Sequence, residues 1–242
     1  SKQSSLGLTC HDLEDKIINN KLLKFFYLTT IPKKLTDQII KTLELSDLEL
    51  QGIELSFLSQ SRLVDDEISY LNNNEGLIIL DLLKECSYVN FVTKSGVIFS
   101  ERITAIREFP QALIEKKDLE NISPNEISKE EIIYKHENYL PPSLMDINTI
   151  HREFKKILDL NSEILENFKF KQIYLIGINS GHKNIADIIS EKFKLATKTI
   201  RPVSNKNIQK INFNDFFLHQ SLASLLGALL GLKQKTNSEN NL

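Results

Sequence analysis

The sequence has few of the features that mark secreted, membrane-spanning or nucleic-acid-binding proteins. Its 242 residues include two cysteines, Cys10 and Cys86, too few for a disulfide framework, which indicates free thiols in a reducing compartment. The net charge of −2 does not predict the basic face that nucleic acid requires. The first residues lack the apolar core of a signal peptide, and the strongest apolar stretch, 216–232, is too short to span a membrane. We therefore predict a soluble cytoplasmic protein without nucleic-acid partners or direct membrane insertion.

Three short strands with tight links are predicted in the middle of the chain. A continuous apolar run at 77–81 follows a turn-prone segment, and residues 88–93 are rich in β-formers. Residues 94–96, Lys-Ser-Gly, are a hairpin signal, and 97–103 alternate as a third strand. Strands joined by such short links pair antiparallel.

The hydrophobic period then changes from two to 3.6 residues. Apolar residues at three- and four-residue intervals predict one long amphipathic helix over 147–168. The elements expected after it are a strand at 173–176, a helix at 183–193, a strand at 197–201 and an apolar helix at 215–232. Strands linked through helices are normally parallel neighbours, so strand 173–176 should pair parallel to 77–81. The result is an α/β, ribonuclease-H-like unit with a mixed five-stranded sheet and helices on both faces.

Two segments do not fit this unit. Residues 107–143 are charged, contain two prolines and have weak apolar periodicity, so we expect a mobile insert on the sheet edge or a small lobe. Residues 233–242 have almost no apolar content, and we expect a disordered tail.

The N-terminal part of the sequence is predicted to form part of a second unit. The predicted elements are a helix at 8–19, a strand at 22–30, a helix at 33–45, a strand at 50–53 and a helix at 56–71. This order repeats the rear half of the unit above without its opening strands. We therefore predict a partial first domain at 1–74 and a complete domain at 75–232.

Two such units in tandem form the actin-like fold, and the chain resembles one branch of it, the PilM-type proteins of bacterial type IV pilus assembly. The stretch 25–64 is similar to the family's strand, Pro-initiated helix, "GIE" and alanine/leucine helix. Residues 77–103 resemble its strand ending in Asp and the following hairpin, and 173–203 resemble its strand, glycine loop, helix and strand. Residues 224–232 are similar to its closing helix. The resemblance also implies that the family's N-terminal segment is missing from this sequence.

In nucleotide-binding relatives, the turn after the first strand of the unit has roughly the sequence Asp-x-Gly, and it binds phosphate and Mg²⁺. Here Asp81 is in place, but Leu83 stands at the glycine position and would crowd a phosphate. Glu85 would repel it. The resemblance thus implies a phosphate turn that has lost its function.

The loop after the strand at 173–176 has changed in a similar way. The resemblance places small residues at Gly177, Ile178 and Asn179 and a further glycine at Asn184, and only Gly177 matches. Gly181 is displaced from the pattern. Ile178 cannot adopt positive φ cheaply, whereas Asn179 can, so we expect the turn to keep its shape through Asn179. Asp81, Gly177, Asn179 and Gly181 are therefore the candidate residues of a relic nucleotide site.

No other constellation points to chemistry. The five histidines show no metal-ligand spacing, and catalytic elbows and Walker loops are absent. We therefore predict a scaffold that binds no cofactor and docks the short cytoplasmic tail of a membrane-associated pilus-assembly protein, lying at the inner face of the membrane through that partner. The alternatives are an actin-like protein that binds or hydrolyses ATP with Mg²⁺, and a related secretion or cell-division scaffold.

Overall fold

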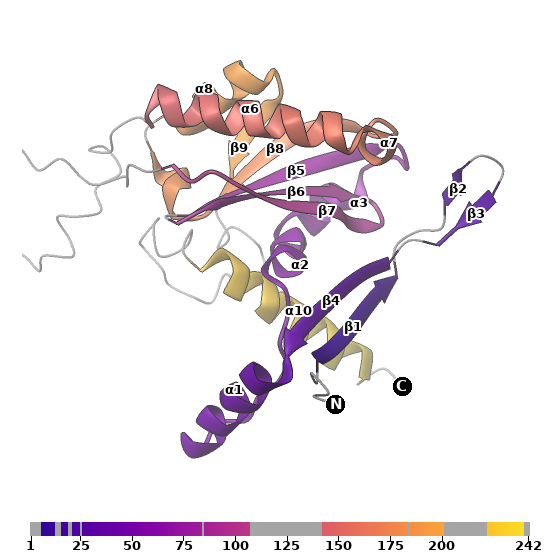
Figure 1. Ribbon diagram of the computed structural model, residues 1–242, viewed down its shortest axis with the longest axis vertical. Coiled ribbons are helices and arrows are strands. Elements are labelled where there is room, and N and C mark those ends of the chain that lie inside the picture. Colours follow the sequence, from indigo (N-terminus) through magenta and orange to yellow (C-terminus); the bar gives the residue numbers. More distant parts are fainter. Residues whose placement is uncertain are drawn as a thin grey trace, which may run out of the picture. The chain divides into compact units, whose positions relative to one another are not determined.

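The computed structural model describes residues 6–12, 16–18, 21–24, 26–83, 85–106, 142–182, 184–200 and 222–239 (Figure 1). The chain divides into two compact units, Ser1–Leu55 and Ser56–Leu242. The predicted insert lies outside the described residues except for its last two positions, and so does the predicted start of the last helix at 215.

A mixed five-stranded sheet is the centre of the second unit. Its strands are β5 (Glu75–Leu82), β6 (Ser87–Thr93), β7 (Gly96–Ile103), β8 (Lys169–Ile176) and β9 (Ala196–Thr199). The strand order is β7-β6-β5-β8-β9. Strands β5, β6 and β7 pair antiparallel, whereas β8 pairs parallel to both β5 and β9. The predicted antiparallel strands and the predicted parallel pairing are therefore confirmed.

Helices cover both faces of this sheet (Figure 1). One face carries α6 (Leu144–Leu160), α7 (Ser162–Leu165) and α8 (Ile185–Phe193). The other carries α2 (Ser56–Ser61), the 3₁₀ turn η1 (Arg62–Val64), α3 (Asp65–Ser69) and α10 (Ala223–Glu239). Among the described residues, none of the helices combines the length and the apolar character needed to cross a membrane.

The alternation of side chains along β5 decides which residues face which helices. Ile78 and Leu80 belong to the core under α6 and α8, whereas Leu77 and Ile79 belong to the core under α2 and α10. Successive residues of a strand point to opposite faces of its sheet. Asp81 is therefore in phase with the residues that face α2 and α10.

The helix predicted over 147–168 is two helices. α6 ends at Leu160, and Asn161 has the non-helical angles φ −117 and ψ 26 before α7 begins. Both the backbone N–H and the side-chain amide of Asn161 donate to the carbonyl oxygen of Ile157, at 3.0 and 2.9 Å. Asparagine competes in this way for backbone partners, which explains the break in an otherwise helical pattern.

The predicted tail is also different in the structure. α10 extends through Glu239, and only the last three residues of the predicted disordered segment lie outside the described part. Lys, Gln and Glu in this stretch favour helix, and extending an existing helix requires no new nucleus. Low apolar content alone was therefore insufficient evidence for disorder.

The described residues of the first unit form two antiparallel strand pairs and one helix. β1 (Leu6–Asp12) pairs with β4 (Phe26–Pro32), and β2 (Lys16–Ile18) pairs with β3 (Lys21–Leu23). The helix α1 (Lys33–Leu45) is confirmed. The predicted helix at 8–19 and the predicted strand at 50–53 are wrong. In β1 the residues Leu6, Leu8 and Cys10 alternate with others, a period of two that fits a strand.

The units also divide at a different position from the predicted domains. Residues 56–71 are compact with the five-stranded sheet because Leu63, Val64 and Leu71 belong to the core under α10. The division therefore falls between Leu55 and Ser56 and not after residue 74. The assignment of the two parts to actin-like domains stays a prediction.

Candidate functional site

The predicted site residues lie where β5 and β8 end. Asp81 pairs with Ile176 in the parallel register, and Gly177 follows directly. In open α/β sheets, ligands bind in the crevice beyond the carboxyl ends of parallel strands. The structure therefore places Asp81, Gly177, Asn179 and Gly181 near the edge where a ligand is expected. All four residues are buried.

Gly177 is required by packing against the end of β5. It has φ +83, a conformation that favours glycine. A Cβ added there would lie 2.6 Å from Oδ1 of Asp81 and 2.6 Å from the carbonyl oxygen of Leu82. The absence of a side chain thus lets the loop approach the neighbouring strand, which explains this glycine without a ligand.

Asp81 is held by a network of buried and partly buried polar side chains. The hydroxyl of Ser100 donates to Oδ1 of Asn90 at 2.7 Å, and Nδ2 of Asn90 donates to Oε1 of Gln60 at 3.0 Å. Nε2 of Gln60 then donates to Oδ2 of Asp81 at 2.6 Å and to the hydroxyl of Ser224 at 2.8 Å. These hydrogen bonds connect all three antiparallel strands with α2 and α10.

The environment of Asp81 disfavours its charged form. Its exposed fraction is 4%, and burial raises the pKa of the carboxyl from 3.8 to about 6, an effect that the hydrogen bond from Gln60 opposes. The hydrogen bond from the amide of Gln60 stabilises the charged form of Asp81 against this penalty.

Asn179 serves the loop in a different way from the prediction. Residues Ile178–Gly181 form the 3₁₀ turn η3, and Asn179 does not have positive φ. Its side-chain amide instead donates to the carbonyl oxygens of Leu83, at 3.0 Å, and Ile106, at 3.1 Å. The predicted left-handed role belongs to Asn184, with φ 57, and Gly181 does not have positive φ.

The described residues around Asp81 do not by themselves form a metal site. The carboxylate of Asp81 already accepts from Gln60, and the part of the chain that the structure describes contains no group of three or more His, Cys, Asp or Glu side chains that could hold a metal. Oδ1 of Asn179 and the hydroxyl of Ser180 have no hydrogen-bond partner within the part of the chain that the structure describes, but both atoms are buried from solvent. Ordered water commonly satisfies such atoms.

Sequence reasoning missed Gln60, Asn90, Ser100 and Ser224. The available signal was the phase of Asn90, which shares the buried face of β6 with Val92. A polar residue in phase with a buried apolar face needs a hydrogen-bonding partner, which could have prompted a search for one.

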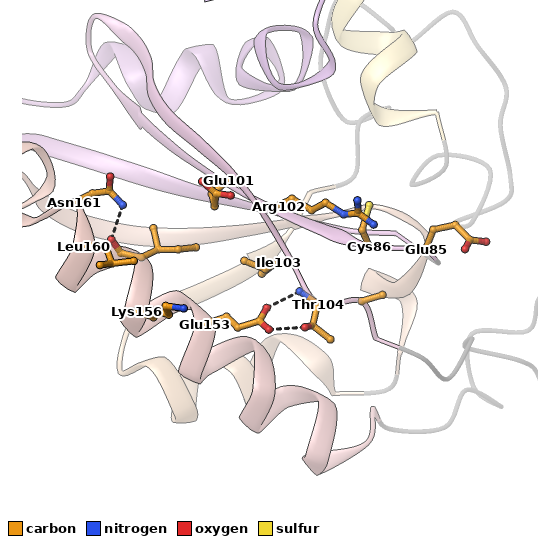
Figure 2. A pocket seen from close by; sticks show the side chains of 12 residues that line it. Glu85, Cys86, Glu101, Arg102, Ile103, Thr104, Glu153, Lys156, Leu160 and Asn161 are labelled. Atoms are coloured by element: carbon orange, nitrogen blue, oxygen red, sulfur yellow. Dashed lines mark hydrogen bonds between the residues drawn. The ribbon is translucent and has the colours of Figure 1, made fainter.

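A separate pocket of about 720 Å³ lies between β7, the turn before β6, and α6 (Figure 2). Its lining combines apolar side chains such as Ile157 with the charged groups of Arg102 and Lys156. Figure 2 shows that the Glu153 carboxylate is already engaged, because it accepts from the backbone N–H and the hydroxyl of Thr104, each at 2.6 Å. None of the four predicted site residues lines this pocket.

Comparisons with known proteins give the same fold. No family model and no curated protein matches the chain. A chain of a PilM–PilN type IV pilus biogenesis complex superposes with a TM-score of 0.59 at 12% identity, over 93% of this chain and 66% of that chain. The predicted actin-like fold agrees with this match, which shows a likeness of fold alone. The resemblance to PilM-type proteins is thus confirmed as a similarity of fold.

Two further matches have lower TM-scores. MreB5 of Spiroplasma citri bound to AMPPNP gives 0.45 at 16% identity, over 87% of this chain and 67% of that one. The ethanolamine utilization protein EutJ from Carboxydothermus hydrogenoformans gives 0.41 at 12% identity, over 81% and 59%. The chain spans less than two thirds of the PilM–PilN and EutJ chains that it matches.

Proposed function

We propose that this chain is a scaffold of type IV pilus assembly that binds the short cytoplasmic tail of a membrane-associated assembly protein. The observation that carries the proposal is the superposition on a chain of the PilM–PilN complex over 93% of this chain. The partner would be a PilN-like protein. The chain would work in the cytoplasm, at the inner face of the membrane through that partner.

The hydrogen bonds of the strand-end site, which consists of Asp81, Gly177, Asn179 and Gly181, favour a scaffold over an ATPase. Asp81 is bonded to Gln60, and the amide of Asn179 is bonded to two backbone carbonyls. Phosphate binding uses free backbone N–H groups, and Mg²⁺ uses free oxygen ligands. A scaffold needs only the surfaces of the fold, so it can tolerate a site whose polar groups bond to one another.

Binding to two probes tests this proposal. The first probe is a synthetic peptide with the sequence of the cytoplasmic tail of a PilN-like protein, titrated into the 242-residue protein by calorimetry. We expect a dissociation constant in the micromolar range, about −8 kcal/mol, and no binding of a scrambled peptide. Absence of tail binding would contradict the pilus assignment and favour another scaffold of the same fold.

The second probe is Mg-ATP, which separates the scaffold from the ATPase alternative. We expect a dissociation constant in the millimolar range or weaker, because each lost hydrogen bond to a charged phosphate removes about 1.5–3 kcal/mol. A dissociation constant below about 10 µM would establish nucleotide binding. Loss of that binding in the variant Asp81→Asn would place the nucleotide at the strand ends.

A further inference from the structure

The hydrogen bond between Gln60 and Asp81 joins two segments that lie 21 positions apart in the sequence. Gln60 has an exposed fraction of 2% and lies on α2, which packs against α10. Its amide has two N–H groups, and they donate to Asp81 and Ser224. The donor capacity of this side chain is therefore fully used inside the protein.

The hydrogen bonds upstream of Gln60 determine how its amide is oriented. Because Asn90 donates to Oε1, the nitrogen of Gln60 is directed toward Asp81. Ser100 donates to Oδ1 of Asn90 and orients that amide in turn. Each donor in this chain points toward the next residue, and the chain ends on a carboxylate. Hydrogen bonds aligned in this way strengthen one another, and those that end on a charge are the strongest.

We propose that Gln60 is the built-in partner of Asp81, which closes the strand-end site to cations and clamps α2 and α10 to β5. This inference rests on the proposed function in one respect, since both treat the nucleotide cleft as degenerate. It adds the residue responsible. Gln60 determines specificity here, because its amide donates to the Oδ2 atom of Asp81, which a cation would otherwise coordinate.

A double-mutant cycle tests the clamp. Gln60→Met keeps an unbranched side chain of similar length but removes the donor. At about pH 8, where Asp81 is charged, we expect Gln60→Met to lower the urea midpoint roughly twice as much in the wild-type background as in the Asp81→Asn background. Thr104→Val is the matched control. It removes the hydroxyl bond to Glu153 elsewhere in the unit, and it should lower the midpoint equally in both backgrounds.

A magnesium titration is a second test, and it needs no Gln60 variant. The carboxyl carbon resonance of Asp81, assigned by its loss in Asp81→Asn, should not move when millimolar Mg²⁺ is added to the wild-type protein. A resonance that moves and saturates would overturn the inference, and so would equal effects of Gln60→Met in the two backgrounds. If Gln60→Met folds only when combined with Asp81→Asn, the two residues are strongly coupled, which supports the inference. If it folds in neither background, the magnesium titration alone decides.

These outcomes remain distinct from those of the proposed function. The cycle and the magnesium titration use neither a partner tail nor a nucleotide. Failure of the tail to bind would therefore overturn the pilus assignment and leave the role of Gln60 standing. A tight Mg-ATP complex that Asp81→Asn abolishes would overturn both.

Discussion

The buried charge of Asp81 makes the stability of the second unit dependent on pH. Its carboxyl has a pKa of about 6 in the folded protein against 3.8 as an isolated group, because burial penalises the charged form. A carboxyl with a raised pKa contributes stability that is fully present below the unfolded pKa. That contribution is lost as pH rises through the folded pKa. The relevant window therefore runs from about pH 4 to pH 7.

The magnitude follows from the two pKa values. The difference of about two units, at 1.36 kcal/mol each, amounts to about 3 kcal/mol lost between low and high pH. The variant Asp81→Asn carries no titrating group, and its side-chain oxygen can still accept from Gln60. We expect this variant to unfold with a free energy up to about 3 kcal/mol higher than wild type at about pH 8, and with a similar free energy near pH 4.

Urea unfolding followed by circular dichroism at several pH values measures this difference. Amide hydrogen exchange of β5 reports on the unit that contains Asp81. Glu101→Gln on the exposed surface of β7 is a control that removes a carboxylate without the burial. The reasoning would be refuted if Asp81→Asn were no more stable than wild type at high pH, or if the difference did not change with pH.

Three further predictions concern packing and ionisation. A strained backbone conformation alone costs about 1–3 kcal/mol. Gly177→Ala should lower the free energy of unfolding in denaturant melts by more than this, because positive φ combines with a close approach to β5. Gly96→Ala, where positive φ occurs in open space, should cost less; equal losses would contradict the packing argument. Gly227→Ala should weaken the contact of α10 with Ser59 on α2 and increase hydrogen exchange in α10, whereas unchanged exchange would count against it. Absorbance titration should show Tyr174 ionising near pH 12, since burial raises its pKa to about 12, and loss of that step in Tyr174→Phe checks the assignment.

The sheet of the second unit was accessible to sequence reasoning because its signals are local. The runs that became β5 and β8 are continuous and apolar, as strands buried on both faces should be. The glycine at 96, with φ +109, marked the hairpin between β6 and β7. Each pattern spans fewer than ten residues, so the order of strands and helices could be read without knowing what they contact.

The first unit was less accessible because its strands are stabilised by distant partners. β1 is a strand because it pairs with β4, from Leu6 opposite Pro32 to Asp12 opposite Phe26. Such pairing is a property of two segments, and neither segment alone distinguishes a short alternating strand from a short helix. This is the physical reason that the helix predicted at 8–19 is wrong.

The sequence by itself placed Asp81 and Gly177 together, because each follows a recognisable strand and the carboxyl ends of parallel strands meet at one edge. Tertiary structure decided which side chains contact these residues. Gln60 reaches Asp81 from another element, and Ser224 reaches Gln60 across 164 positions of sequence. No local pattern encodes a hydrogen bond between such distant side chains. Whether the carboxylate is open to a ligand or held within the protein is therefore settled by packing, since only packing brings the amide of Gln60 to within 2.6 Å of it.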